Sequence, residues 1–264
     1  MIKVLLIGDI VGEPGRKAIS QLVPFLRERE RLDLVVANSE NVAGGVGITP
    51  PIMKELFESK VDVLTSGNHA WDKKEGIHLY DLEPRLLRPA NYPTTSYYPT
   101  PGRGAVIVET KKGMKVGIVN LMGRVFLGNF DCPFQTADRE IPKLTEKTKI
   151  ILVDFHAETT SEKKAMAFFL DGRVSALVGT HTHVQTADDQ ILKKGTAYIT
   201  DLGMTGPHDS VIGMDHQKVL EKFLTLRPAK YDVAKEGGRL QGVIVEIDEE
   251  SGKASSIRRV DEKI

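Results

Sequence analysis

Short apolar runs alternate with amphipathic stretches in the first quarter of the chain. The runs at residues 3–7, 33–37 and 61–65 are continuous rather than alternating, which indicates strands buried on both faces. Between them, residues 16–31 place apolar side chains on one helical face, with Pro24 expected to kink or shorten the helix. Thr49 followed by two prolines predicts an N-cap and a helix ending near residue 59.

The later chain mixes this alternation with hairpins. Strands are expected at residues 149–153, 174–178 and 196–199, and helices at 161–170 and 214–226. Two hairpins are predicted, at residues 104–109 with 114–121 and at 239–247 with 254–260. Residues 123–143 are predicted to form a long loop, a feature that is usually functional. Helices flanking packed sheets, an α/β fold in a single domain spanning 1–264, fit this order.

Polar side chains fall where the predicted strands end. In open α/β sheets the carboxyl ends of the strands form the ligand-binding edge. His181 and His183 would point to the same side if the chain stays extended past its strand. The residues at these ends are Asp9, Glu40, Asn41, Asn68, His69, His156, His181 and His183.

Carboxylate, amide and imidazole donors without a cysteine suit manganese, iron or zinc. The set is too large for one four-coordinate ion and is about right for two ions that share a bridging carboxylate. Most of these residues also have an ordinary structural explanation. Asp9 is compatible with a turn or a helix cap, Asn41 and Asn68 with loop positions, His156 with a core histidine, and the His181–His183 pair with a solvated surface. Their common location at strand ends favours a joint site.

Composition narrows the function classes. The 264 residues are 41% hydrophobic with a formal net charge of +0, which argues against a long basic surface for nucleic acid, so no stable nucleic-acid complex is expected. A lone Cys132 excludes an internal disulfide framework and a multi-thiolate zinc site, and we expect it to be inert. No signal peptide or membrane-length segment is found, so we expect a cytoplasmic protein without membrane contact. Nucleotide-binding motifs of the G-x-x-x-x-G-K-[ST] and G-x-G-x-x-G types are absent. A homo-oligomer remains open.

Four motifs together resemble a known family. The chain is similar to the calcineurin-like metallophosphoesterases and, more narrowly, to their bacterial YmdB-like branch, whose members are described as 2′,3′-cyclic-nucleotide 2′-phosphodiesterases. Two positions depart from the general superfamily pattern, with Val11 in place of a histidine and Glu40 in place of an aspartate, as in the narrower branch. The motifs are residues 8–12, 38–41, 67–69 and 179–185, and the resemblance spans nearly the whole chain.

The resemblance implies a four-layer α-β-β-α sandwich and two metal ions per chain, iron or manganese. Glu40 would bridge the ions and His69 would be the catalytic acid. The substrate would be a small cyclic nucleotide, and His208 lies in a loop that could cover the site. Two alternatives remain: a broader phosphatase or nucleic-acid-end phosphodiesterase, and a metal-stabilised regulatory protein. The implied metal ligands are Asp9, Glu40, Asn41, Asn68, His156, His181 and His183.

Overall fold

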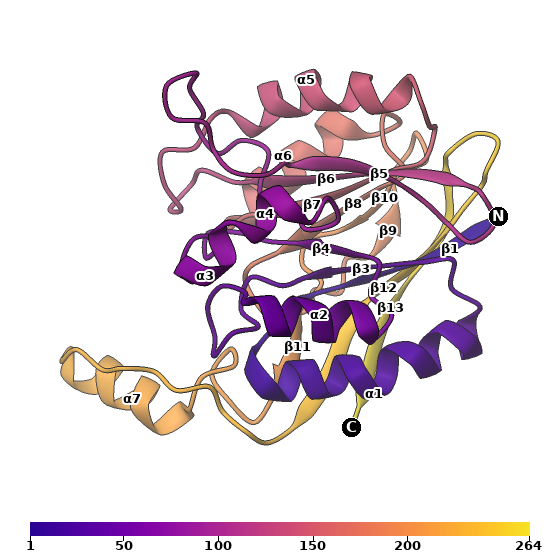
Figure 1. Cartoon of the computed structure of the whole chain (residues 1–264). Coiled ribbons are helices and arrows are strands. Elements are labelled where there is room, and N and C mark those ends of the chain that lie inside the picture. Colours follow the sequence, from indigo (N-terminus) through magenta and orange to yellow (C-terminus); the bar gives the residue numbers. More distant parts are fainter.

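The computed structural model describes residues 1–264, in which two mixed β-sheets pack face to face between helices (Figure 1). The first sheet has the order β2-β11-β12-β1-β3-β4, with β13 paired to β12. Strands β1, β3 and β4 are parallel, whereas β12 is antiparallel to β1 and to β13. Its strands are β1 (Ile2–Ile7), β2 (Asp9–Ile10), β3 (Leu34–Asn38), β4 (Val63–Thr65), β11 (Met204–Pro207), β12 (Gly238–Ile247) and β13 (Ala254–Lys263).

The second sheet has the order β5-β6-β7-β8-β10-β9. Its central strands β6, β7, β8 and β10 are parallel, and the two edge strands are antiparallel to their neighbours. The strands are β5 (Ala105–Glu109), β6 (Lys115–Met122), β7 (Ile151–His156), β8 (Ala176–Thr180), β9 (Gln190–Ile191) and β10 (Ala197–Ile199).

Helices cover the outer faces of both sheets. α1 and α2 lie against the first sheet, and α5 and α6 lie against the second (Figure 1). α7 extends away from the sheets, and Val219 is its only buried side chain. No helix combines the length and apolar character needed to cross a bilayer. The helices are α1 (Gly12–Glu30), α2 (Pro50–Glu58), α3 (Lys74–Ile77), α4 (Leu79–Leu82), α5 (Pro133–Thr145), α6 (Thr160–Leu170) and α7 (His216–Thr225).

Strand β1 shows why the predicted strands are apolar on both faces. Leu5 and Ile7 pack against the helices of the first layer, whereas Val4 and Leu6 pack between the two sheets. Successive side chains of a strand point to opposite faces, so a strand in a middle layer needs apolar residues at every position. The predicted α-β-β-α sandwich is confirmed.

Two sequence expectations about elements differ from the structure, and three short strands were not predicted. The predicted loop at residues 123–143 contains most of α5, whose apolar positions Ala137, Ile141 and Leu144 join the core of the second helical layer. α1 begins at Gly12 and continues through Pro24 to Glu30, because the buried stripe on its inner face holds it against the sheet. The short strands β2, β9 and β11 were not predicted, since pairing with distant partners rather than local pattern defines them.

Candidate metal centre

His156, the last residue of β7, lies at the centre of a buried cluster of polar side chains. Its side chain is fully buried. Its Nε2 atom lies 3.0 Å from His181 Nδ1, 3.1 Å from Asn68 Oδ1 and 3.2 Å from Glu40 Oε1. Three potential ligand groups from other strand ends therefore converge on one imidazole nitrogen.

The cluster joins the two sheets. Glu40 and Asn68 follow β3 and β4 of the first sheet, whereas His156 and His181 stand at the ends of β7 and β8 of the second. Gly67 makes the approach possible, because a Cβ there would lie 2.2 Å from Glu40 Oε2 and 2.3 Å from His156 Nε2. The glycine before Asn68 is thus needed for space rather than for a turn.

Asp9 and Asn41 each place one buried oxygen in this region without a hydrogen-bond partner. Asp9 Oδ2 accepts a hydrogen bond from the His181 backbone N–H at 3.0 Å, and its Oδ1 has no hydrogen bond. Asn41 Nδ2 donates to the Gly45 carbonyl at 2.9 Å, and its Oδ1 also has no partner. Buried oxygens in folded proteins are normally satisfied, so two orphans at one edge require a cause.

The ionisation of the cluster follows from burial and mutual charge. Burial raises the pKa of Asp9. Burial would also raise the pKa of Glu40, but the neighbouring His156 opposes it and lowers that pKa to about 2. Burial would lower the pKa of His156, but Glu40 outweighs it and raises that pKa to about 9. Burial, reinforced by His156, lowers the pKa of His181 to about 3. His181 is therefore a neutral imidazole with a lone pair to offer.

These residues fit a bound divalent cation. A cation would satisfy the two orphaned oxygens and would account for two imidazoles meeting nitrogen to nitrogen. One ligand atom from each of Glu40, His156 and His181 lies within 4.8 Å of the others. Hard oxygen and imidazole donors without thiolate are typical of manganese, iron or zinc sites.

The turn that carries the His-x-His pair is not extended, so the condition under which both rings would point to the same side is not met. β8 ends at Thr180, and His181 and His183 have φ angles of 102° and 63°. The Asp201 carboxylate holds this turn by accepting a hydrogen bond from Thr182 N at 3.1 Å. Only His181 therefore reaches the cluster directly, while His183 Nδ1 donates to the Ile212 carbonyl at 2.9 Å.

His69 stands at the rim of the cluster. Its backbone N–H donates to Glu40 Oε2 at 3.2 Å, and its Nδ1 lies 2.7 Å from Asp72 Oδ2. Its side chain is 33% exposed. The Asp72 carboxylate fixes the ring through Nδ1, and Nε2 makes no hydrogen bond within the chain.

Five of the seven predicted ligands are in direct contact with one another, and two are not. Asp9 is connected to the cluster because its Oδ2 accepts a hydrogen bond from the His181 backbone N–H, and its Oδ1 lies 3.8 Å from His156 Nδ1. Asn41 and His183 make no hydrogen bond to this set, although the charge of His183 lowers the pKa of Asp9 against the larger effect of burial. The linked residues are Asp9, Glu40, Asn68, His156 and His181.

Sequence reasoning missed the residues that orient the cluster. Thr180 Oγ1 lies 3.0 Å from His156 Nδ1 and donates to Asp154 Oδ1 at 2.7 Å. Burial raises the pKa of Asp154 to about 6. A carboxylate in the middle of the apolar run at residues 151–156 was the signal that could have marked this support.

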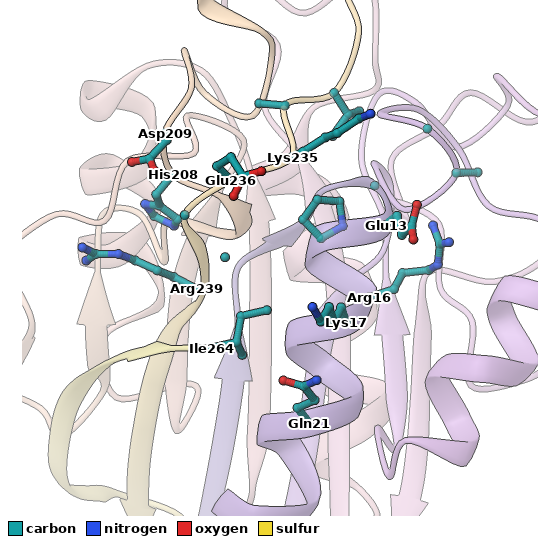
Figure 2. A pocket seen from close by; sticks show the side chains of 18 of the residues that line it. Glu13, Arg16, Lys17, Gln21, His208, Asp209, Lys235, Glu236, Arg239 and Ile264 are labelled. Atoms are coloured by element: carbon teal, nitrogen blue, oxygen red, sulfur yellow. The ribbon is translucent and has the colours of Figure 1, made fainter.

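A cavity of about 1130 Å³ is lined by none of the predicted ligands. Figure 2 shows its wall, to which α1 contributes Lys17 and Gln21 and the segment before β12 contributes Lys235 and Glu236. His208 lines this cavity and also a smaller one of about 450 Å³ that includes His183. His208 Nε2 contacts the Met204 carbonyl at 3.1 Å, and its side chain makes no hydrogen bond to the cluster.

Comparison with known proteins identifies related chains over the full length. The family model described as YmdB-like protein matches residues 5–260. A Bacillus subtilis (strain 168) protein named 2′,3′-cyclic-nucleotide 2′-phosphodiesterase is 46% identical over 259 residues, covering 98% of this chain and 96% of that protein.

Two solved structures are also similar. A hypothetical protein from Thermus thermophilus superposes with a TM-score of 0.91 at 41% identity, over 99% of each chain. A structure described as a novel phosphatase from Mycoplasma pneumoniae gives a TM-score of 0.92 at 35% identity, over 99% of this chain and 93% of that one. Sequence family and fold therefore agree.

Proposed function

The chain belongs to the YmdB-like family, and from that premise we propose that it is a metal-dependent phosphodiesterase that hydrolyses 2′,3′-cyclic nucleotides to 3′-nucleotides. The supporting observation is the pair of buried, unpartnered oxygens, Asp9 Oδ1 and Asn41 Oδ1, beside an imidazole cluster that joins both sheets. The name of the Bacillus subtilis relative supplies the substrate class.

The proposed metal ligands are distributed over both sheets. Two bound cations, iron or manganese, would neutralise charge on the non-bridging phosphate oxygens and lower the pKa of the attacking water. Glu40, whose two carboxylate oxygens face His156 and the His69 backbone, is the proposed bridge. The full set is Asp9, Glu40, Asn41, Asn68, His156, His181 and His183.

His69 is the proposed general acid. Water adds its oxygen to phosphorus, the bond from phosphorus to the 2′ oxygen breaks, and the 2′ oxygen needs a proton to leave as a hydroxyl. His69 Nε2 would donate that proton, while Asp72 holds Nδ1 and orients the ring. The product keeps its phosphate at the 3′ position.

The test combines metal analysis with steady-state kinetics on 2′,3′-cyclic AMP. We expect about two metal ions per chain, turnover that chelation abolishes, and a His69→Ala variant that keeps its metal while turnover falls roughly 10²–10⁴-fold. His78→Ala is the matched control, since that histidine makes no side-chain hydrogen bond to the cluster, and should leave turnover unchanged. One metal per chain at saturation would refute the bridging role of Glu40. Unchanged turnover in His69→Ala would refute the assignment of the acid.

The same experiments separate the alternatives. A broader phosphatase would turn over p-nitrophenyl phosphate as well as 2′,3′-cyclic AMP, and a nucleic-acid-end phosphodiesterase would prefer oligonucleotides that end in a 2′,3′-cyclic phosphate. A metal-stabilised regulatory protein would bind metal without measurable turnover of any of these. The first two outcomes change the substrate and the third removes the catalytic role, while all three retain the proposed metal centre.

A further inference from the structure

Phe126 is the most exposed phenylalanine of the chain, with 88% of its surface accessible. It occupies the third position of a turn that Leu127 N closes by donating to the Arg124 carbonyl at 3.2 Å. Its φ angle of 64° is in the left-handed region, where glycine or asparagine is normal and a phenylalanine is sterically disfavoured. Strain of this kind persists where the surrounding structure imposes it, and it clusters at functional sites.

This turn is fixed directly beside the metal centre. Gly123 N donates to the His156 carbonyl at 2.8 Å, so the turn begins next to the central imidazole residue. The Glu162 carboxylate on α6 accepts hydrogen bonds from Arg124 N at 3.0 Å and from Val125 N at 3.4 Å. Phe126 is only three residues beyond Gly123, which limits its Cα to within roughly 11 Å of that anchor.

The other side of the turn is connected to the segment that carries His69. The ring of Phe130 lies 3.3 Å from the position of a Cβ on Gly128 and packs edge-to-face on Tyr92, with centroids 5.0 Å apart. The Tyr92 hydroxyl donates to the Gly67 carbonyl at 3.1 Å. Phe126 therefore projects from a turn supported at both the His156 side and the His69 side of the site.

Arg124 adds a cation to the same turn. Its side chain is exposed, and its guanidinium makes no hydrogen bond or ion pair within the chain. The turn therefore presents the Arg124 cation next to the unpacked Phe126 ring. This pair is complementary to a ligand that carries both an anionic phosphate and a flat aromatic base. Single-stranded nucleotide sites commonly use an aromatic side chain as a stacking surface of this kind.

We propose that Phe126 is the stacking platform for the nucleobase of the substrate and thereby determines the preference for nucleotides over other cyclic phosphodiesters. The inference rests on the proposed function, because it names how that site holds its substrate. Stacking is tolerant of base identity, since every base has a flat π-face, so the preference extends to all four bases.

The test compares two cyclic phosphodiesters, 2′,3′-cyclic AMP and glycerol 1,2-cyclic phosphate, which lacks a base. In Phe126→Ala the KM for 2′,3′-cyclic AMP should rise about 10-fold, the scale of one base–aromatic stack, with kcat nearly unchanged. Both constants for the glycerol compound should stay at the wild-type values. Phe126→Trp should restore the KM, and its tryptophan emission should be quenched by 3′-AMP but not by glycerol phosphate.

Phe168→Ala is the matched control, because Phe168 is 74% exposed on α6 and has no place in the site. Phe168→Ala should leave KM and kcat unchanged for both substrates. Equal losses on both substrates in Phe126→Ala, or no loss on 2′,3′-cyclic AMP, would overturn the stacking role while leaving the proposed function intact. A wild-type protein that cleaves neither compound would instead overturn the proposed function, and the stacking role with it.

Discussion

Two groups of buried charged side chains lie at the same edge of the sheets and differ in completeness. Lys163 Nζ lies 2.7 Å from Asp201 Oδ2, and Asp201 also accepts hydrogen bonds from Thr182 N and Gly203 N. Both side chains of this ion pair are fully buried, and each has its partner within the chain. The His156 cluster instead contains an orphaned carboxylate oxygen on Asp9 and two imidazoles in contact. Burial of charge alone therefore does not mark a binding site, and the His156 cluster differs from the Lys163–Asp201 pair by its unpartnered oxygen.

The largest expected effect comes from Asp9→Asn. This change removes one negative ligand but keeps an oxygen to accept the His181 N–H, so the metal-free fold should persist. Turnover should fall by about 10³-fold or more, because metal-ion catalysis contributes several kcal/mol to the barrier. Metal content per chain should fall in parallel. A variant with full metal content and full turnover would contradict the role of Asp9.

Lys163→Met should lower stability rather than metal content. It leaves Asp201 as a buried carboxylate without its cation, which costs about 3–5 kcal/mol of unfolding free energy. The hydrogen bond that Thr182 N donates to Asp201 remains, so metal stoichiometry in the folded protein should be unchanged. Urea denaturation measures the unfolding free energy, and metal analysis of the folded protein measures the stoichiometry. The double variant Lys163→Met with Asp201→Asn should recover much of the loss, and a failure to recover would show that the pair contributes more than charge balance.

Chelation should lower the stability of the protein only through loss of metal from the His156 cluster. Removing a cation that binds only the folded state lowers the unfolding free energy by about 2.7 kcal/mol when the free metal had been at 100 times its dissociation constant. Thermal unfolding with and without chelator measures the shift. Asp9→Asn should show little or no shift under the same treatment. An equal shift in both proteins would indicate that the metal binds elsewhere.

Two buried asparagines, Asn91 and Asn41, differ in the same way and should give the smallest effects. The side-chain amide of Asn91 has partners for both of its polar atoms: its nitrogen donates to the Met122 and Asp131 carbonyls, and its oxygen accepts from Met122 N. The side-chain oxygen of Asn41 has no hydrogen-bond partner. Asn91→Ala should cost about 1–3 kcal/mol of stability, because it strands buried backbone groups, and should leave metal binding unchanged. Asn41→Ala should cost less stability and weaken metal binding. Titration calorimetry and denaturation separate the two effects, and equal metal affinity in both variants would remove Asn41 from the proposed ligands.

Local pattern predicted the layers of the fold but not every element. The continuous apolar runs that became β1, β3, β4 and β7 identified strands in middle layers. α5 was missed although Ala137, Ile141 and Leu144 share one buried helical face, and Pro142 in its last turn does not prevent that packing. β11 contains Gly206 and Pro207, which suggest a turn, and becomes a strand only through pairing with β2 and β12.

The candidate site was predictable to a similar degree. The polar residues at strand ends predicted which side chains gather, because parallel strands share one carboxyl edge. The left-handed backbone at His181 was not predictable, since it depends on Asp9 and Asp201 capturing the N–H groups of the turn. For the same reason the sequence did not separate His181, which enters the cluster, from His183, which turns toward Ile212.

The placement of the cluster between the sheets has a consequence for the order of assembly. Asp9 and His181 are 172 positions apart in the chain, and they meet only when the two sheets have docked. A ribosome must release most of the polypeptide before both halves of the site exist. On the proposed function, the complete metal site would form late in maturation, so the ion would bind after folding rather than nucleate it.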